Sequence, residues 1–131
     1  MIALYPTAAQ IEALAAESAG RPVVMLNLLR FRERASAPDE GMSGREAYQR
    51  YGAGVRPLIE RYGGEILWAG RVDRMVIGSC EEGFDAIALV RYPSRQKFLE
   101  MAADPELAQV SVHRAAGLEG QWLIAATDDL V

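Results

Sequence analysis

The chain has 131 residues, of which 50% are hydrophobic and 24% are charged, and its formal net charge is -4. This size suits a single domain over 1–131 with its own hydrophobic core, and the composition excludes a disordered, collagen-like or membrane-embedded chain. Binding to nucleic-acid phosphates needs clustered Lys and Arg. The acidic balance therefore disfavours a nucleic-acid partner.

The cysteine content and the apolar runs bear on the compartment. The one cysteine, Cys80, cannot form an internal disulfide or supply a thiolate metal site, which suits a reducing environment. The first residues do not have the pattern of a secretory signal, and no apolar run approaches membrane-spanning length. We therefore expect a cytoplasmic protein that has no membrane partner.

The first expected elements are a helix and a buried strand. Residues 7–19 begin with a helix-capping Thr7 and carry apolar residues at helical spacing. The run 23–31 is apolar enough for a strand that is buried on both faces. The charged stretch 32–41 contains proline and glycine and is typical of a loop.

A long helix is expected next. Ser43, with Glu46 three residues later, has the pattern of a capping box, and apolar residues then repeat with helical period as far as Tyr62. Pro57 inside this segment predicts a kink. The glycine pair 63–64 predicts its end.

The remaining expected elements are two strands joined by a polar turn, a helix that restarts, and a last strand. Their bounds are 65–77 and 84–92 for the strands, 78–83 for the turn, about 94–117 for the helices and 121–126 for the last strand. Asp104 and Pro105 mark the restart, because a capping residue followed by proline is typical of a helix start. Gly70 predicts a bulge or bend in the first of these strands.

The order of elements is a helix followed by β-α-β-β-α-β. Two β-α-β halves joined by a hairpin predict an α+β, ferredoxin-like fold, with a four-stranded antiparallel sheet and helices on one face. The helix-free face would still carry apolar side chains, because the strands are apolar in both alternations. Such a face is expected to be buried in a partner, and a second copy of the chain is the simplest one.

Six short segments form an ordered pattern over residues 22–126. They are 25–31, 44–52, 63–70, 92–95, 104–106 and 113–114. Together they resemble the domain of unknown function 1330 family, within the dimeric α/β-barrel superfamily. The resemblance implies the ferredoxin-like fold and a homodimer. It implies no reaction, because the family has none assigned and the wider superfamily includes monooxygenases, isomerases, haem-binding enzymes and non-catalytic sensors.

Two polar residues are candidates for catalysis. His113 is the one histidine, and histidine is the side chain type whose ordinary pKa lies near neutrality, so it could act as a general acid or base. The alternatives for it are a place on a helix surface or in a hydrogen-bond network, and axial haem ligation. Asn27 interrupts an apolar strand, where a buried amide must find partners. It could orient a substrate carbonyl or satisfy a neighbouring backbone group.

Aromatic side chains with polar tips could line a small-molecule pocket, although such residues also fill cores. They are Tyr48, Tyr51, Trp68 and Tyr92. Four arginines adjoin them, namely Arg30, Arg71, Arg91 and Arg114. One or two of these could hold a substrate carboxylate through paired hydrogen bonds, and the others would form surface ion pairs. The predicted substrate-binding set is Arg30, Tyr48, Tyr51, Trp68, Arg71 and Arg114.

The motifs of nucleotide, phosphate, zinc-protease and serine-hydrolase sites do not occur in the sequence, so no cofactor or metal is expected. The leading prediction is a homodimeric small-molecule domain that works as a cofactor-independent enzyme, monooxygenase-like or isomerase-like. Its substrate would be a small aromatic or carbonyl-bearing metabolite, with His113 as acid or base and Asn27 as an orienting group. The alternatives are a non-catalytic ligand-binding or sensing module and a purely structural dimer.

Overall fold

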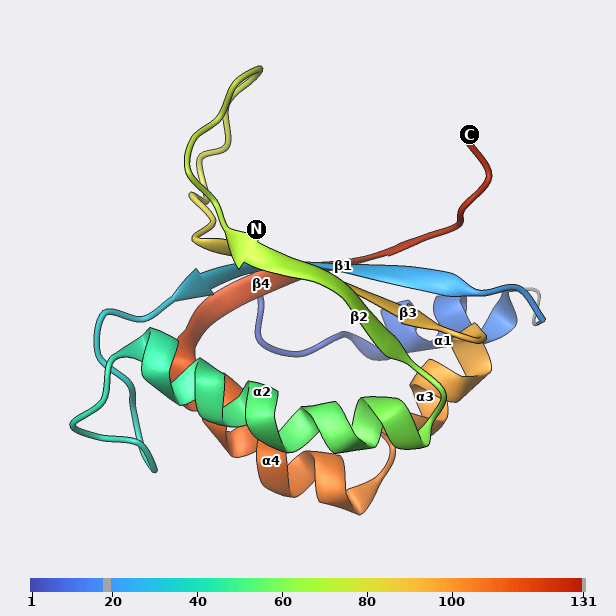
Figure 1. Ribbon diagram of the computed structural model, residues 1–131, viewed down its shortest axis with the longest axis horizontal. Coiled ribbons are helices and arrows are strands. Elements are labelled where there is room, and N and C mark those ends of the chain that lie inside the picture. The colour runs from blue at the N-terminus through green and yellow to red at the C-terminus, as the bar shows by residue number, and fades with distance from the viewer. Residues whose placement is uncertain (18–19, 131) are drawn as a thin grey trace.

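A computed structural model describes residues 1–17 and 20–130. Its helices are α1 (Ala8–Ala16), α2 (Gly44–Arg61), α3 (Arg95–Ala102) and α4 (Pro105–Gly117). Its strands are β1 (Val23–Phe31), β2 (Glu65–Arg71), β3 (Ala86–Tyr92) and β4 (Leu118–Ala126). The strands pair antiparallel in the order β2-β3-β1-β4, and the helices lie on one side of the sheet (Figure 1). The predicted ferredoxin-like α+β fold with an extra N-terminal helix is confirmed.

The core lies between the sheet and the helices. Val23, Met25 and Leu29 of β1 are buried on this side, because alternate residues of a strand point to the same face. Val23 pairs with Tyr92 of β3 and Met25 pairs with Val90, so these buried side chains form one layer across the two strands. The helices pack onto that layer.

Helices α2 and α4 lie side by side beneath the sheet (Figure 1). The predicted capping box of α2 is present: Ser43 Oγ accepts the Glu46 N–H at 3.1 Å, and a Glu46 carboxylate oxygen accepts the Ser43 N–H at 3.0 Å. A side chain on Gly54 would place its Cβ 2.6 Å from Val110, so glycine is what allows the two helices to approach there. The helix runs past Pro57 to its end at Arg61.

The second strand is shorter than the predicted 65–77. It ends at Arg71, and residues 72–85, here called the long loop, rise from the sheet (Figure 1). A segment with alternating apolar residues forms a strand only where a neighbouring strand continues to pair with it. Among the described residues, the backbone pairing between β2 and β3 ends with the bond from the Val72 N–H to the Asp85 oxygen at 2.9 Å.

Three further boundaries differ from the sequence expectation. Strand β3 begins at Ala86, two residues later than the predicted 84–92. The last strand begins at Leu118, directly after α4 and earlier than the predicted 121–126, because Leu118 is fully buried and pairs with Phe31 across an irregularity in the ladder. Helix α1 ends at Ala16, and residues 18–19 of the predicted helix lie outside the described residues.

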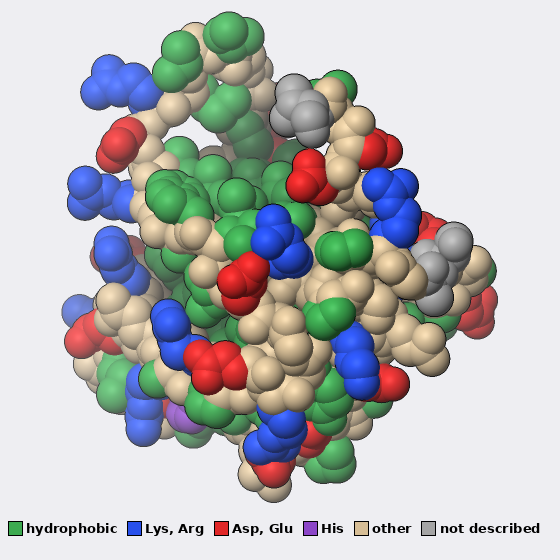
Figure 2. Space-filling view, turned by 45° about the vertical axis from the view of Figure 1, so that its right-hand side comes forward, with side chains coloured by type: hydrophobic (Ala, Val, Ile, Leu, Met, Phe, Trp, Pro, Cys, Tyr) green, Lys and Arg blue, Asp and Glu red, His purple; other side chains and the backbone are tan. Residues whose placement is uncertain are grey.

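The far side of the sheet is not covered by a helix (Figure 1). Its side chains are large and apolar, and Trp68 and Ile124 among them are 53% and 44% exposed. Figure 2 shows hydrophobic side chains gathered in a hollow below the arch of the long loop. We call this surface the bare face, and its residues are Leu26, Leu28, Trp68, Ile87, Leu89, Trp122 and Ile124.

Candidate functional site

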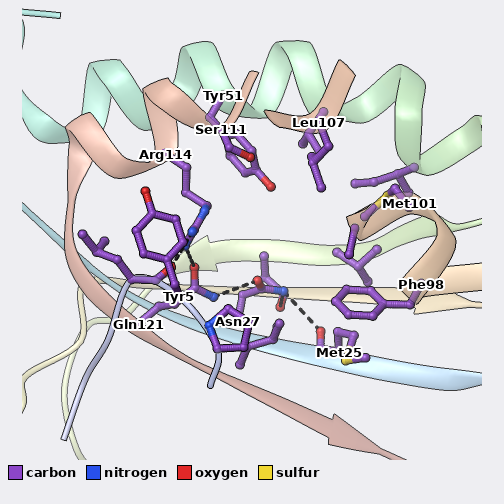
Figure 3. A pocket seen from close by; sticks show the side chains of 18 of the residues that line it. Tyr5, Met25, Asn27, Tyr51, Phe98, Met101, Leu107, Ser111, Arg114 and Gln121 are labelled. Carbon is purple, nitrogen blue, oxygen red and sulfur yellow. Dashed lines mark hydrogen bonds between the residues drawn. The ribbon is translucent and has the colours of Figure 1, made fainter. Parts of the chain in front are cut away.

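A cavity of about 1740 Å³ lies between the sheet and the helices. The strands form its floor, and α2 and α4 lie above it (Figure 3). Side chains of α1 and of the N-terminal segment, residues 1–6, complete part of the wall. Small-molecule pockets are usually about 300–1,000 Å³. The cavity therefore has room for a ligand of metabolite size.

A chain of hydrogen bonds crosses one end of the cavity (Figure 3). Arg114 of α4 donates to Gln121 Oε1 at 2.9 Å, and Gln121 Nε2 donates to Asn27 Oδ1 at 3.3 Å. The Asn27 amide nitrogen donates to the backbone oxygens of Met25 at 3.4 Å and Ala88 at 3.3 Å. The Asn27 amide thus satisfies neighbouring backbone groups and also positions Gln121.

Arg114 supplies the positive charge at this end. Its guanidinium also donates to the Leu4 backbone oxygen and lies over the Tyr5 ring, with Cζ 5.3 Å from the ring centroid. Among the described residues, no carboxylate lies within ion-pair distance of it. Its position in the last turn of α4 places it at the negative end of the helix dipole, which offsets part of the charge.

Two tyrosines of α2 line the same cavity. The rings of Tyr48 and Tyr51 are 5.4 Å apart between centroids. Burial raises the pKa of both phenols, and the nearby positive charge of Arg114 acts in the opposite sense without overcoming it. At neutral pH both groups are therefore protonated, so they can donate hydrogen bonds but cannot act as bases.

The opposite end of the cavity is apolar. Phe98 and Met101 of α3, Leu107 of α4 and Met25 of β1 gather there (Figure 3). Phe98 packs edge-on against Tyr92, with the ring centroids 5.2 Å apart. The cavity therefore offers a polar end and an apolar end to one ligand.

The structure brings half of the predicted site residues to this cavity. Those that line it are Asn27, Tyr48, Tyr51 and Arg114. Those that do not are Arg30, Trp68, Arg71 and His113. Tyr92, which the sequence also singled out, lines the apolar part.

His113 belongs to a different polar cluster. Its Nδ1 is 2.7 Å from Asp39 Oδ2, and Asp39 Oδ1 accepts a hydrogen bond from Arg50 at 2.8 Å. The Asp39 side chain is fully buried. The cluster ties the loop between β1 and α2 to both α2 and α4, which is the hydrogen-bond-network role considered for this histidine as an alternative to catalysis.

Strand geometry explains why three other candidates lie elsewhere. Arg30 is three positions from Asn27 on the same strand, so it points to the opposite face, where it pairs with Glu119 at 2.8 Å. The strand register shifts between Ile66 and Trp68, which turns Trp68 onto the bare face; the sequence had indicated a bulge at Gly70 instead. Arg71, at the end of β2, is exposed and 3.6 Å from Asp73.

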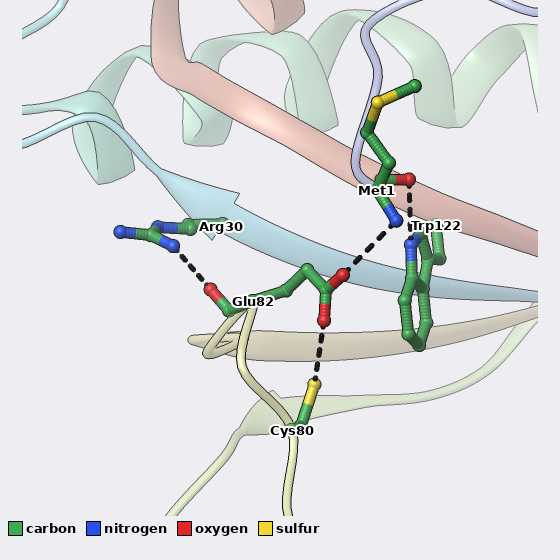
Figure 4. Close-up of polar contacts among 5 residues, drawn as sticks. All are labelled: Met1, Arg30, Cys80, Glu82 and Trp122. Atoms are coloured by element: carbon green, nitrogen blue, oxygen red, sulfur yellow. Dashed lines mark hydrogen bonds and ion pairs between the residues drawn. The ribbon is translucent and has the colours of Figure 1, made fainter.

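A second hollow of about 520 Å³ lies on the bare face beneath the long loop. The Glu82 carboxylate accepts from the Met1 ammonium group at 3.1 Å and lies 3.6 Å from Cys80 Sγ (Figure 4). The bond to the ammonium group lowers the pKa of Glu82. Arg30 donates to the Glu82 backbone oxygen, and Trp122 Nε1 donates to the Met1 oxygen at 3.0 Å. These contacts hold the long loop and the N-terminus onto the sheet.

Sequence reasoning missed several cavity residues. Gln121 carried a usable signal, because it is a polar residue in an apolar strand, as Asn27 is. Tyr5 carried none, since it precedes every predicted element and reaches the cavity only because Ala3 pairs with Gln121 at the edge of β4. Phe98 and Met101 were recognisable as apolar helix positions but not as cavity lining.

Two absences can be stated for the described part of the chain. It contains no cluster of three or more His, Cys, Asp or Glu side chains that could hold a metal ion. None of its helices is both long and apolar enough to cross a membrane.

The fold and the cavity together define a ferredoxin-like α+β domain with a cavity between its sheet and its helices. The family described as Domain of unknown function (DUF1330) matches residues 41–127, and the chain belongs to this family. The resemblance identified from the sequence is thereby confirmed. No curated protein matches the chain.

Solved structures are similar over most of the chain. RPA0582, a protein of unknown function from Rhodopseudomonas palustris, is 36% identical, with a TM-score of 0.90 over 100% of both chains. A hydroxynitrile lyase from Passiflora edulis is 12% identical, with a TM-score of 0.61 over 86% of this chain and 97% of the lyase. A dimeric protein of unknown function and ferredoxin-like fold from Bacteroides fragilis is 11% identical, with a TM-score of 0.52 over 81% and 95%. The last two show the fold alone.

Proposed function

We propose that this protein binds a small organic molecule in the cavity between the sheet and the helices, and that it does so as a homodimer. The cavity itself carries the proposal. The cavity is partly open to solvent, and a concave space of about 1740 Å³ with distinct polar and apolar ends is the kind of site in which small molecules bind.

A cavity-filling substitution tests ligand binding. Ala88→Leu enlarges a side chain on the cavity floor, and Ala103→Leu makes the same change at an exposed site outside the cavity. Mass spectrometry of small molecules extracted from the purified protein should find a compound with the wild type and with Ala103→Leu, and less of it with Ala88→Leu. If nothing is extracted and the wild type also fails to bind 1-octanol by calorimetry, the proposal is wrong.

Catalysis is the second candidate function, in the form of a cofactor-independent, monooxygenase-like or isomerase-like reaction on an aromatic or carbonyl-bearing metabolite. The protonated phenols of Tyr48 and Tyr51 beside Arg114 favour it, since they could stabilise charge that develops on a substrate oxygen. Incubation of the extracted compound with fresh protein decides between the two. A changed product supports an enzyme, and recovery of the unchanged compound supports a binding module.

The bare face supports the homodimer. Trp68 and Ile124 on this face are exposed and its other apolar side chains are half-buried, and such a surface on a monomer usually marks an interface. The accessible surface of the chain is 8353 Å², whereas a compact monomer of this mass exposes roughly 6,800 Å². The ferredoxin-like relative from Bacteroides fragilis is dimeric. A second copy of the chain bound to the bare face would bury part of this additional accessible surface.

We also propose a cytoplasmic location. Cys80 is a free thiol, which suits a reducing compartment. Fractionation of cells that express the protein tests this, and recovery with an exported fraction would contradict it.

A further inference from the structure

The charge of Arg114 is not neutralised by the protein around it. A guanidinium has five N–H donors, and two of the Arg114 groups have acceptors in the structure, on Gln121 and Leu4. Both acceptors are neutral oxygens. A cation that is partly removed from water is costly unless an anion approaches it. The remaining N–H groups leave room for such an anion.

The other titratable groups of the cavity do not supply it. The Tyr48 and Tyr51 phenols are neutral at physiological pH, because burial raises their pKa. Glu17, the acidic residue among the described lining, is 2.7 Å from Arg95 Nε and is engaged there. The polar end of the cavity therefore keeps a net positive charge.

We propose that Arg114 anchors the carboxylate of an organic monocarboxylic acid whose apolar body extends toward Phe98 and Met101. This inference rests on the proposed function. The planar fork of a guanidinium matches the two oxygens of a carboxylate, and one guanidinium balances one negative charge. A phosphate monoester, with up to two charges, would remain partly unbalanced at this end.

The groups around Arg114 fix the orientation of its guanidinium for such a ligand. Gln121 and the Leu4 backbone oxygen fix two of its donors, and the Tyr5 ring lies against its face. Ser111, one helical turn earlier on α4, lines the same part of the cavity (Figure 3). From this end the lining changes to the apolar groups of α3, so a ligand with a charged head and an apolar body meets matching surfaces along its length.

Calorimetry with two probes tests the anchor. Octanoate and 1-octanol share an eight-carbon chain and differ in the charge of the head group. The wild type should bind octanoate more tightly than 1-octanol. Arg114→Gln should weaken octanoate binding by roughly 10- to 100-fold and leave 1-octanol binding unchanged. Arg45→Gln, which removes the same charge from an exposed site of α2 outside the cavity, should leave both affinities unchanged.

The outcomes separate this inference from the proposed function. Equal binding of both probes, insensitive to Arg114→Gln, overturns the carboxylate anchor and keeps the cavity as a binding site. Failure of the wild type to bind either probe overturns both. If Arg114→Gln does not fold, Arg114→Lys keeps the charge but loses the fork, and an unchanged octanoate affinity in that variant also counts against the anchor.

Discussion

Asp39 shows how a single residue outside the cavity can shape it. Its carboxylate is fully buried and takes one hydrogen bond from Arg50 and one from His113. A buried carboxylate needs such partners, because its loss of hydration must be offset. Ala37 and Pro38, which precede Asp39, line the cavity, so these bonds also hold part of its wall.

Replacing His113 tests this structural role. His113→Ala removes one partner of a buried carboxylate and should lower the free energy of unfolding by about 1–3 kcal/mol. Urea denaturation measures the loss, and Gln109→Ala, an exposed change on the same helix, should cost much less. Octanoate affinity should stay close to that of the wild type. A variant that is fully stable but has lost binding or turnover would return His113 to the functional site.

Asp104 gives a residue-scale prediction on pH. Its Oδ2 accepts from the Tyr62 hydroxyl at 2.7 Å and its Oδ1 accepts from the Glu106 N–H at 2.8 Å, and these bonds lower the pKa of Asp104. A carboxyl whose pKa is lower in the folded state stabilises the fold above its unfolded pKa, about 3.9. This stabilisation is lost as the pH falls through the lowered pKa that Asp104 has in the folded state.

Tyr62→Phe should raise the pKa of Asp104 toward its usual value and make unfolding less dependent on acid pH. Carbon NMR titration of the side-chain carboxyl measures the first effect, and urea denaturation at neutral and acid pH measures the second. Glu46, whose pKa is lowered by its hydrogen bonds with Ser43, should titrate unchanged in this variant. If the pKa of Asp104 is the same in this variant as in the wild type, the hydrogen bond from Tyr62 is not what lowers it.

At the scale of elements, local signals predicted most of the structure and long-range pairing did not. The capping box of α2 and the Asp104 cap of α4 are local, so the sequence revealed them. The bulge in β2 and the early end of that strand depend on how β3 pairs with it, which alternation alone does not encode. For this reason the sequence did not show that Trp68 lies on the bare face.

The packing of α2 against α4 predicts opposite changes in stability for two glycine substitutions. A Cβ on Gly117 would lie 2.4 Å from the Gly44 backbone oxygen, whereas a Cβ on Gly52 would meet nothing within 4 Å. Gly117→Ala should therefore destabilise the protein by about 1–3 kcal/mol through overpacking. Gly52→Ala should stabilise it by up to about 1 kcal/mol through helix propensity. Thermal unfolding compares them, and two shifts of the same sign would contradict this account of the crossing.

At the scale of the whole molecule, the order of elements was sufficient to predict the sheet and its bare face. The cavity was not predictable as a volume, because it results from the distance that the helices keep from the sheet. Its polar end also depends on the N-terminal segment beside β4, and no pattern in the sequence predicts that pairing. Asn27, Tyr48, Tyr51 and Arg114 could be selected as residue types, but their convergence is a property of the fold.

Changes on the bare face test the homodimer. Trp68→Glu and Ile124→Glu place charges within the proposed interface and should convert the dimer to a monomer, because an unpaired charge is costly to bury. Light scattering after gel filtration measures the mass. Val112→Glu, at an exposed apolar site of α4 in the helix layer, should leave the dimer intact. A wild-type protein that is monomeric at all concentrations would remove the proposal.

The chain has two tryptophans, and both Trp68 and Trp122 belong to the bare face. Trp122 also lines the cavity, whereas Trp68 does not. In a Trp122→Phe variant, the emission of Trp68 should therefore follow association of two copies, with a blue shift as the indole leaves water, and respond little when the cavity fills. One untagged sample could thus report the two events through separate optical signals, and the order in which a dimer forms and a ligand enters becomes measurable.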